Sequence, residues 1–166
     1  PDLTEGATYL KVSRDFFCGK DKRAVPDFAL PSRHTDLKSI SLSENILVWF
    51  GHSSYYIQLD GKRILVDPVF SGAASPFAFT TRAFAGTDAY TCDDMPVIDY
   101  LFISHDHYDH LDHQTALQLM PKVKKVFCGL GTGEHLEYWG YSPEIIGELD
   151  WYDRIETGDG FVVHST

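Results

Sequence analysis

The amino-acid sequence predicts a mixed α/β fold. Two β-type runs, residues 54–59 and 62–66, flank Asp60-Gly61, and Asp-Gly between such runs is the strongest short-range signal for a two-residue hairpin turn. From residue 97 to residue 149 the pattern then alternates strand, helix, strand, helix and strand, which is typical of α/β domains. A composition of 43% hydrophobic and 14% aromatic residues excludes a disordered or fibrous chain. The 166 residues suit one domain, or one large half of a two-layer fold.

The first part of the chain is expected to contain an N-terminal arm, a strand and a long loop. Residues 1–45 are mixed and polar, and we interpret them as an irregular N-terminal arm with weak helical pieces. Residues 46–50 are apolar, β-branched or aromatic, which predicts a buried strand at the start of a domain over residues 46–166. Residues 67–96 follow no helical or strand period. We expect a packed loop whose phenylalanines wall a pocket for an acyl chain: Phe70, Phe77, Phe79 and Phe84.

The second part supplies the alternating elements. Residues 97–103 are apolar on both faces apart from Asp99, as in a strand inside a sheet. A helix is expected over about residues 112–120, with Asp112 as a candidate N-cap and Pro121 as its stop. The further expected elements are a strand over 122–128, a helix over 134–139 ended by Gly140, and strands over 145–149 and 161–164.

Charge and cysteine content limit the partners and the compartment. The chain carries 14 Lys and Arg against 24 Asp and Glu, a net charge of −10, which argues against nucleic acid as a partner. Cys18, Cys92 and Cys128 form no CxxC pair, so we expect small buried hydrophobic residues in a reducing, cytoplasmic setting. No apolar run approaches the roughly 20 residues needed to span a bilayer. The chain begins at Pro1, so a targeting segment and peripheral membrane contact both stay open.

The segment that carries chemistry directly follows the strand over residues 97–103. It holds three of the chain's eight histidines, interleaved with carboxylates: His105, Asp106, His107, Asp109, His110 and Asp112. Imidazole and carboxylate are the ligands preferred by Zn²⁺ and related ions. In an extended segment His105 and His107 point to the same side, and Asp109 with His110 can be presented to a neighbouring point as the chain turns. The spacing therefore favours two metal sites over a solvated acidic loop.

Such a centre suits hydrolysis. Bound Zn²⁺ lowers the pKa of water from about 15.7 to about 7, and a pair of metal ions stabilises both the attacking and the leaving oxygen. Asp109 then has a second role, as the catalytic residue that orients the attacking water. An ester, lactone, amide or phosphodiester would each fit this chemistry.

The motif His-x-His-x-Asp-His at residues 105–110 resembles the signature of the metallo-β-lactamase superfamily. The surrounding sequence is similar to the branch that contains the N-acylphosphatidylethanolamine-hydrolysing phospholipase D enzymes and their bacterial relatives. This similarity covers about residues 46–151 and includes segments 49–54, 65–70, 74–76, 129–131, 135–136 and 148–151.

The resemblance implies an αββα sandwich with a metal pair, expected to be two Zn²⁺ in the complete protein, at the rim between two sheets. His105 and His107 would hold the first metal, and Asp109 and His110 the second. The family's remaining ligands, a later histidine, a bridging aspartate and a final histidine, would lie beyond Thr166. The chain therefore resembles the N-terminal half, a mixed sheet with helices on one side.

The resemblance implies a phospholipase D-like phosphodiesterase with a small-molecule or lipid-like substrate. We expect the missing C-terminal half, or self-association, to complete the site, and residues 1–166 alone to hold substoichiometric metal with negligible hydrolysis. Two alternatives stay open. One is a truncated or degenerate, non-catalytic chain, and the other is a lactonase or another ester or amide hydrolase.

Two further residues are candidates near the metals. His52 lies between the first expected strand and the hairpin and is a candidate contact to a ligand or to the substrate. Asp67, at the end of the hairpin and before Pro68, is expected to hydrogen-bond a ligand histidine, because such carboxylates fix the imidazole tautomer. A packed turn histidine and a turn-capping aspartate are the respective alternatives.

Overall fold

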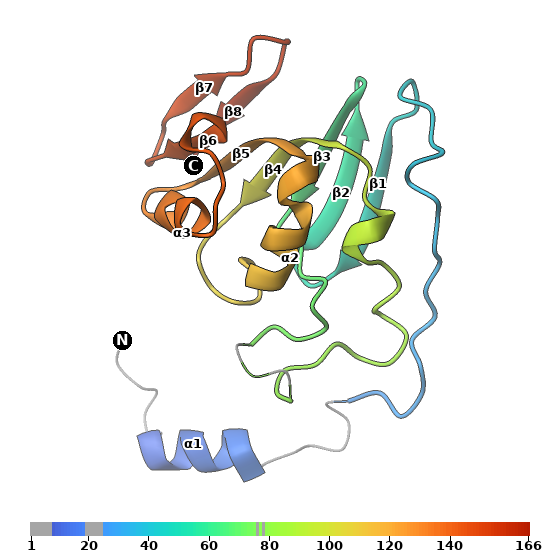
Figure 1. The fold of residues 1–166 in the computed structure, drawn as a ribbon. Coiled ribbons are helices and arrows are strands. Elements are labelled where there is room, and N and C mark those ends of the chain that lie inside the picture. The colour runs from blue at the N-terminus through green and yellow to red at the C-terminus, as the bar shows by residue number, and fades with distance from the viewer. Residues whose placement is uncertain (1–7, 19–24, 76, 78) are drawn as a thin grey trace.

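The structure, a computed structural model, describes residues 8–18, 25–75, 77 and 79–166. Its helices and strands, drawn in Figure 1, are α1 (Tyr9–Cys18), β1 (Ile46–Gly51), β2 (Ser54–Leu59), β3 (Lys62–Val66), β4 (Ile98–Ile103), α2 (His113–Leu119), β5 (Val123–Gly129), α3 (Thr132–Tyr138), β6 (Ile146–Leu149), β7 (Arg154–Glu156) and β8 (Val162–His164). Every predicted strand and helix of the second part of the chain is therefore confirmed, to within one or two residues at most ends.

Local chemistry explains the element ends. The β2–β3 turn has positive φ at both Asp60 (47°) and Gly61 (78°), as the Asp-Gly signal requires. The carboxylate of Asp112 accepts a hydrogen bond from the backbone N–H of Gln114 and caps α2, as predicted. Gly140, with φ of 105°, ends the turn after α3, a conformation that side chains with a Cβ rarely adopt.

The main sheet has six strands in the order β1-β2-β3-β4-β5-β6. The first three strands pair antiparallel, whereas β3, β4, β5 and β6 run parallel to one another. Strand β1 therefore also runs parallel to β3, and the carboxyl ends of β1, β3, β4, β5 and β6 lie at one edge. Helices α2 and α3 lie on one face of the sheet (Figure 1). This arrangement confirms a mixed sheet with helices on one side.

Both faces of the sheet carry apolar clusters. On the helix side, Leu65, Leu101 and Val126 are essentially inaccessible and pack with Leu119 and Leu136 of the helices. On the other face, the buried residues Ile64, Tyr100, Phe127 and Leu149 are packed by side chains from the β7–β8 hairpin. A sheet covered on both faces explains why β4, apart from Asp99, and residues 126–128 of β5 are apolar at consecutive positions.

Strand β1 differs from the prediction, because it is an edge strand and only half buried. Val48 and Phe50 pack toward the helix-side core, whereas Leu47 and Trp49, which point to the opposite face, are 65% and 67% exposed. Apolar residues at consecutive positions predict a strand but do not reveal whether both of its faces are covered.

The N-terminal arm contains a helix and contributes to the core. The described side chains of α1 are exposed, and Cys18 at its end is exposed too, contrary to the prediction of a buried cysteine. Leu37 is fully buried. The buried amide of Gln58 on β2 donates to the carbonyl groups of Ser41 and Glu44, at 2.7 and 2.8 Å, which ties this part of the arm to the sheet. Cys92 and Cys128 are buried, as predicted.

In the described part of the chain, no helix has both the length and the apolar composition that a membrane crossing requires.

Strand β7 was not predicted, and it pairs with β8 as a separate two-stranded sheet. A polar tie holds this hairpin to the main sheet, since Asp159 forms an ion pair with Lys62 and accepts a hydrogen bond from the hydroxyl of Tyr100. The hydrogen bonds from Lys62, Thr157 and Tyr100 hold the pKa of Asp159 well below its usual range.

The Asp159 tie predicts a pH-dependent contribution to stability. Because the folded-state pKa is depressed, the contribution is complete above the ordinary aspartate pKa of about 3.9 and is lost as the pH falls through the lower, folded-state pKa. Thermal unfolding of wild type and Asp159→Asn between pH 7 and pH 2 should therefore differ most at neutral pH, with the difference shrinking in acid. A difference that stays constant over this range would contradict the tie.

Candidate metal centre

The candidate residues converge at the carboxyl edge of the sheet. His52 follows β1, Asp67 follows β3, and residues 104–110 follow β4. Because these three strands run in the same direction, their ends meet at this edge, where ligand sites of open α/β sheets commonly lie. The structure thus brings together the four candidate metal ligands and the two further candidates near the metals: His105, His107, Asp109, His110, His52 and Asp67.

Asp67 is the buried anchor of the centre. Its residue is 3% exposed and has a left-handed φ of 41°. One carboxylate oxygen accepts the backbone N–H of Ser104 at 2.7 Å, and the other accepts the Ser104 hydroxyl at 2.7 Å. The second oxygen also lies 2.8 Å from Nδ1 of His110. Since an ionised carboxylate only accepts, Nδ1 of His110 donates and its Nε2 is left free to bind a metal.

Ser104 is a site residue that sequence reasoning missed. Its Oγ lies 3.0 Å from Nδ1 of His105 and 3.1 Å from Nδ1 of His110. A hydroxyl has one proton to donate, and the charged Asp67 is its strongest acceptor, so Ser104 accepts from Nδ1 of His105. That arrangement leaves Nε2 of His105 free as well. The only sequence signal was its position directly before the first histidine.

Two groups of three ligand atoms form at this edge. Within each group, all ligand atoms lie within 4.8 Å of one another. One group is His105, His107 and Asp109, and the other is His52, Asp109 and His110. Asp109 belongs to both groups. The donors are nitrogen and carboxylate oxygen, the set that suits Zn²⁺ and other first-row divalent ions, so the residues fit a metal pair.

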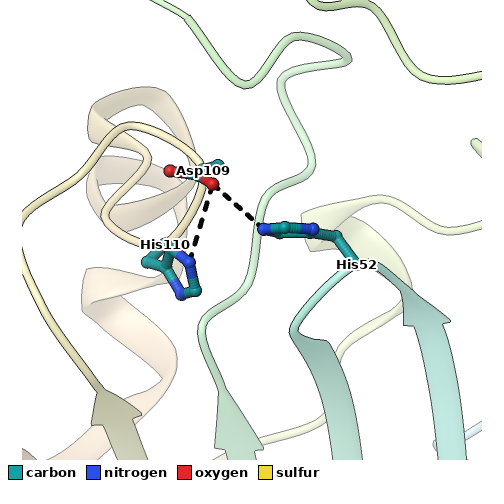
Figure 2. A group of neighbouring side chains, drawn as sticks. All are labelled: His52, Asp109 and His110. Carbon is teal, nitrogen blue, oxygen red and sulfur yellow. Dashed lines mark hydrogen bonds and ion pairs between the residues drawn. The ribbon is translucent and has the colours of Figure 1, made fainter. Parts of the chain in front are cut away.

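Figure 2 shows the second group, in which the carboxylate of Asp109 lies between two imidazole rings. Its Oδ2 is 3.0 Å from Nε2 of His52 and 3.6 Å from Nε2 of His110. Burial alone would raise the pKa of Asp109, but its own backbone N–H and the neighbouring His110 and His52 outweigh this effect. The pKa lies below its usual value, and the carboxylate stays ionised.

A pocket of about 660 Å³ adjoins this group. Trp49, Val69 and Phe84 are among its apolar lining residues, and His52 and Asp109 line it too. Of the four phenylalanines expected to wall a pocket, Phe84 lines this one. Phe70 instead packs edge-on against Phe50 of β1, with the ring centroids 5.2 Å apart.

The remaining two phenylalanines differ from the expectation. Phe77 and Phe79 contact each other, with centroids 5.7 Å apart, and are 60% and 75% exposed. Composition predicted an apolar loop near a pocket, but which phenylalanines face inward depends on the loop's path, which has no sequence period.

Comparison with known proteins places this centre in a family. The Beta-lactamase superfamily domain matches residues 62–166. The N-acyl-phosphatidylethanolamine-hydrolyzing phospholipase D 1 of Caenorhabditis elegans is 33% identical over 119 residues, which are 65% of this chain and 32% of that protein. A metal-dependent hydrolase of Caldivirga maquilingensis is 35% identical over 77 residues, 46% of this chain and 27% of that protein.

A solved structure is similar as well. CmlA of Streptomyces venezuelae, a diiron beta-hydroxylase, is 28% identical with a TM-score of 0.51, covering 68% of this chain and 22% of that one. The chain spans about a third or less of the length of each of these three proteins.

Proposed function

Because the chain belongs to the beta-lactamase superfamily, we propose that its histidine and carboxylate centre serves a metal-dependent hydrolase that cleaves a phosphodiester. The observation that carries the proposal is the carboxylate of Asp109, shared by two three-ligand groups beside an apolar pocket. The match to a relative that hydrolyses a phospholipid supports the phosphodiester. A phospholipid has an apolar part, and a pocket lined by Trp49, Val69 and Phe84 suits it.

In the proposed reaction, each residue has a defined task. His105 and His107 would hold one ion and His110 the other, and Asp109, which belongs to both groups, would be available to either. Zn²⁺ ions, when bound, lower the pKa of water and polarise a phosphoryl oxygen. Asp109 accepts a hydrogen bond from the attacking water and orients it toward the phosphorus. Asp67 and Ser104 keep Nδ1 of His110 and His105 protonated, so that both rings present Nε2 to the ions.

We propose zinc as the metal, since the donor set suits it. Iron is the competing assignment, because one similar protein is a diiron hydroxylase and imidazole with carboxylate also binds iron. The metal content of the purified protein separates the two.

We also propose that residues 46–166 form the N-terminal half of the hydrolase domain, with residues 1–45 as an arm. Leu47 and Trp49 expose a large apolar area on the sheet face opposite the helices, which a second half would cover. The three unpaired cysteines support a cytoplasmic setting, where thiols stay reduced.

The test combines metal analysis with a substrate panel. We expect the 166-residue chain, as purified, to hold substoichiometric zinc and to hydrolyse negligibly. A chain extended by a region equivalent to the rest of the relatives should hold close to two zinc ions. It should also cleave an acylated glycerophosphoethanolamine faster than a lactone or an aryl ester.

Two variants of the extended chain control for general damage. His107→Ala should lose about one of the two zinc ions and most of the activity, whereas His113→Ala, an exposed α2 histidine outside both groups, should keep both zinc ions and the activity. If the wild-type extended chain were folded but bound no metal, the proposal would be wrong and the non-catalytic alternative would be favoured. Preferred cleavage of the lactone would replace the phosphodiester with the ester-type alternative.

A further inference from the structure

We propose that His52 is itself a metal ligand, which completes a three-ligand site with Asp109 and His110. The inference rests on the proposed function, since it requires that this centre binds metal. It goes beyond a hydrogen bond between His52 and Asp109, because it gives the chain a site that needs no ligand from outside residues 1–166.

The distances suit ligation. Nε2 of His52 lies 3.0 Å from Oδ2 of Asp109, and Nε2 of His110 lies 3.6 Å from the same oxygen. Zinc bonds of about 2.0–2.2 Å in a tetrahedral arrangement place neighbouring ligand atoms roughly 3.3–3.6 Å apart. Shifts of a few tenths of an ångström therefore bring both pairs into ligand geometry. The three residues also face one another from two separate segments (Figure 2).

His52 is held in place by its own turn. It has a left-handed φ of 46°, and the indole N–H of Trp49 donates to its backbone carbonyl at 2.9 Å. Across the site, the ring of His110 is fixed through Nδ1 by Asp67. The two rings stand edge to face, with centroids 5.2 Å apart. Ligands held in advance lose little conformational freedom on binding, which favours metal affinity.

The position of Asp109 gives the two groups different numbers of available ligands. Its Oδ2 already lies beside His52 and His110, so an ion bound there uses that oxygen. The other group then keeps His105 and His107 as its own ligands, whereas zinc sites normally take at least three from the protein. We therefore expect the site with His52 to fill first in residues 1–166, and the other to need a further ligand.

Titration of the 166-residue chain with Zn²⁺ and Co²⁺ tests this order. Calorimetry and cobalt visible absorption should show that wild type binds a first equivalent of metal ion per chain more tightly than any second one. His52→Asn should weaken that first equivalent by at least about 100-fold, because losing even a group that only orients a ligand costs about 10- to 100-fold. Asparagine tolerates the left-handed backbone, so the turn should stay folded, as circular dichroism would confirm.

The controls separate this inference from the proposed function. His113→Ala should leave the first equivalent unchanged, and His107→Ala should leave it unchanged while removing any second one. On addition of one zinc equivalent, Nε2 of His52 should shift in ¹⁵N imidazole spectra, which a purely structural role would not cause. Unchanged affinity in His52→Asn, or an unshifted Nε2, would overturn the inference and leave the hydrolase proposal standing. Absence of any zinc binding by the wild-type 166-residue chain would overturn the inference, and absence of zinc binding by the extended chain as well would overturn both proposals.

Discussion

Replacing Asp109 with alanine is expected to remove both metal ions and to reduce hydrolysis by more than about 10³-fold. The reason is that Asp109 is the one residue of the described chain that belongs to both three-ligand groups. Its loss leaves each group with two imidazoles, fewer than zinc sites normally take, and also removes the group that orients the attacking water. Removing a single hydrogen-bond donor that stabilises the transition state lowers kcat of other hydrolases by about 10²–10³-fold, so removing the metal ions should lower the rate further.

Elemental analysis, zinc calorimetry and initial rates measure the effect of Asp109→Ala in the extended chain. Asp106→Ala is the matched control, because Asp106 is an exposed carboxylate of the same loop outside both groups. His107→Ala and His110→Ala should each weaken the binding of chiefly one of the two zinc ions, because each histidine belongs to one group. If Asp109→Ala bound as much zinc as Asp106→Ala, the shared role assigned to this carboxylate would be wrong.

Changing Asp67 to asparagine is expected to lower zinc affinity by about 10- to 100-fold while the protein stays folded. Asp67 accepts three hydrogen bonds, two from Ser104 and one from His110. An amide has one oxygen, so its NH₂ group would face a donor whichever way it turned, and an unsatisfied buried donor costs about 1–3 kcal/mol. The ring of His110 would lose its fixed tautomer and orientation, the usual effect of removing a carboxylate behind a ligand histidine.

Calorimetric zinc titration together with thermal unfolding checks the Asp67→Asn prediction. Asparagine adopts a left-handed backbone more readily than most residues, so the φ of 41° should persist. Asp99→Asn is a useful comparison, because Asp99 sits at the opposite end of β4, away from the metal centre, and accepts a hydrogen bond from the backbone N–H of Arg63. Wild-type zinc affinity in a folded Asp67→Asn protein would contradict the role of Asp67.

Much of the fold follows from local signals in the sequence. The β2–β3 hairpin depends on two adjacent residues with positive φ, and α2 on a cap at Asp112, so both are visible without any tertiary information. Strand β4 is apolar on both faces, apart from Asp99, because both faces are covered. The exposed face of β1 was missed, since its cover depends on what packs on it and not on its own residues. Strand β7 was missed because three residues are too few to show a period.

The candidate site also combines residues that local sequence signals predict with residues whose role only the tertiary structure reveals. His105, His107, Asp109 and His110 are close in sequence, so their spacing alone brought them together. Asp67 was predicted because it ends a strand. The approach of His52 to Asp109 depends on β1 and β4 running in the same direction three strands apart, which is a property of the sheet order. Ser104 was missed because a serine carries no ligand signal, and its role is visible only in its hydrogen bonds.

Anomalous X-ray diffraction, from crystals of the protein grown with excess zinc and recorded on both sides of the zinc absorption edge, tests the central claim most directly. Zinc density is expected within about 2.0–2.2 Å of the ligand atoms of Asp109 and His110, with a second peak at His105 and His107 where the ligand shell is complete. A folded protein whose residues 105–110 show no anomalous density, with these imidazoles directed into solvent, would contradict the account.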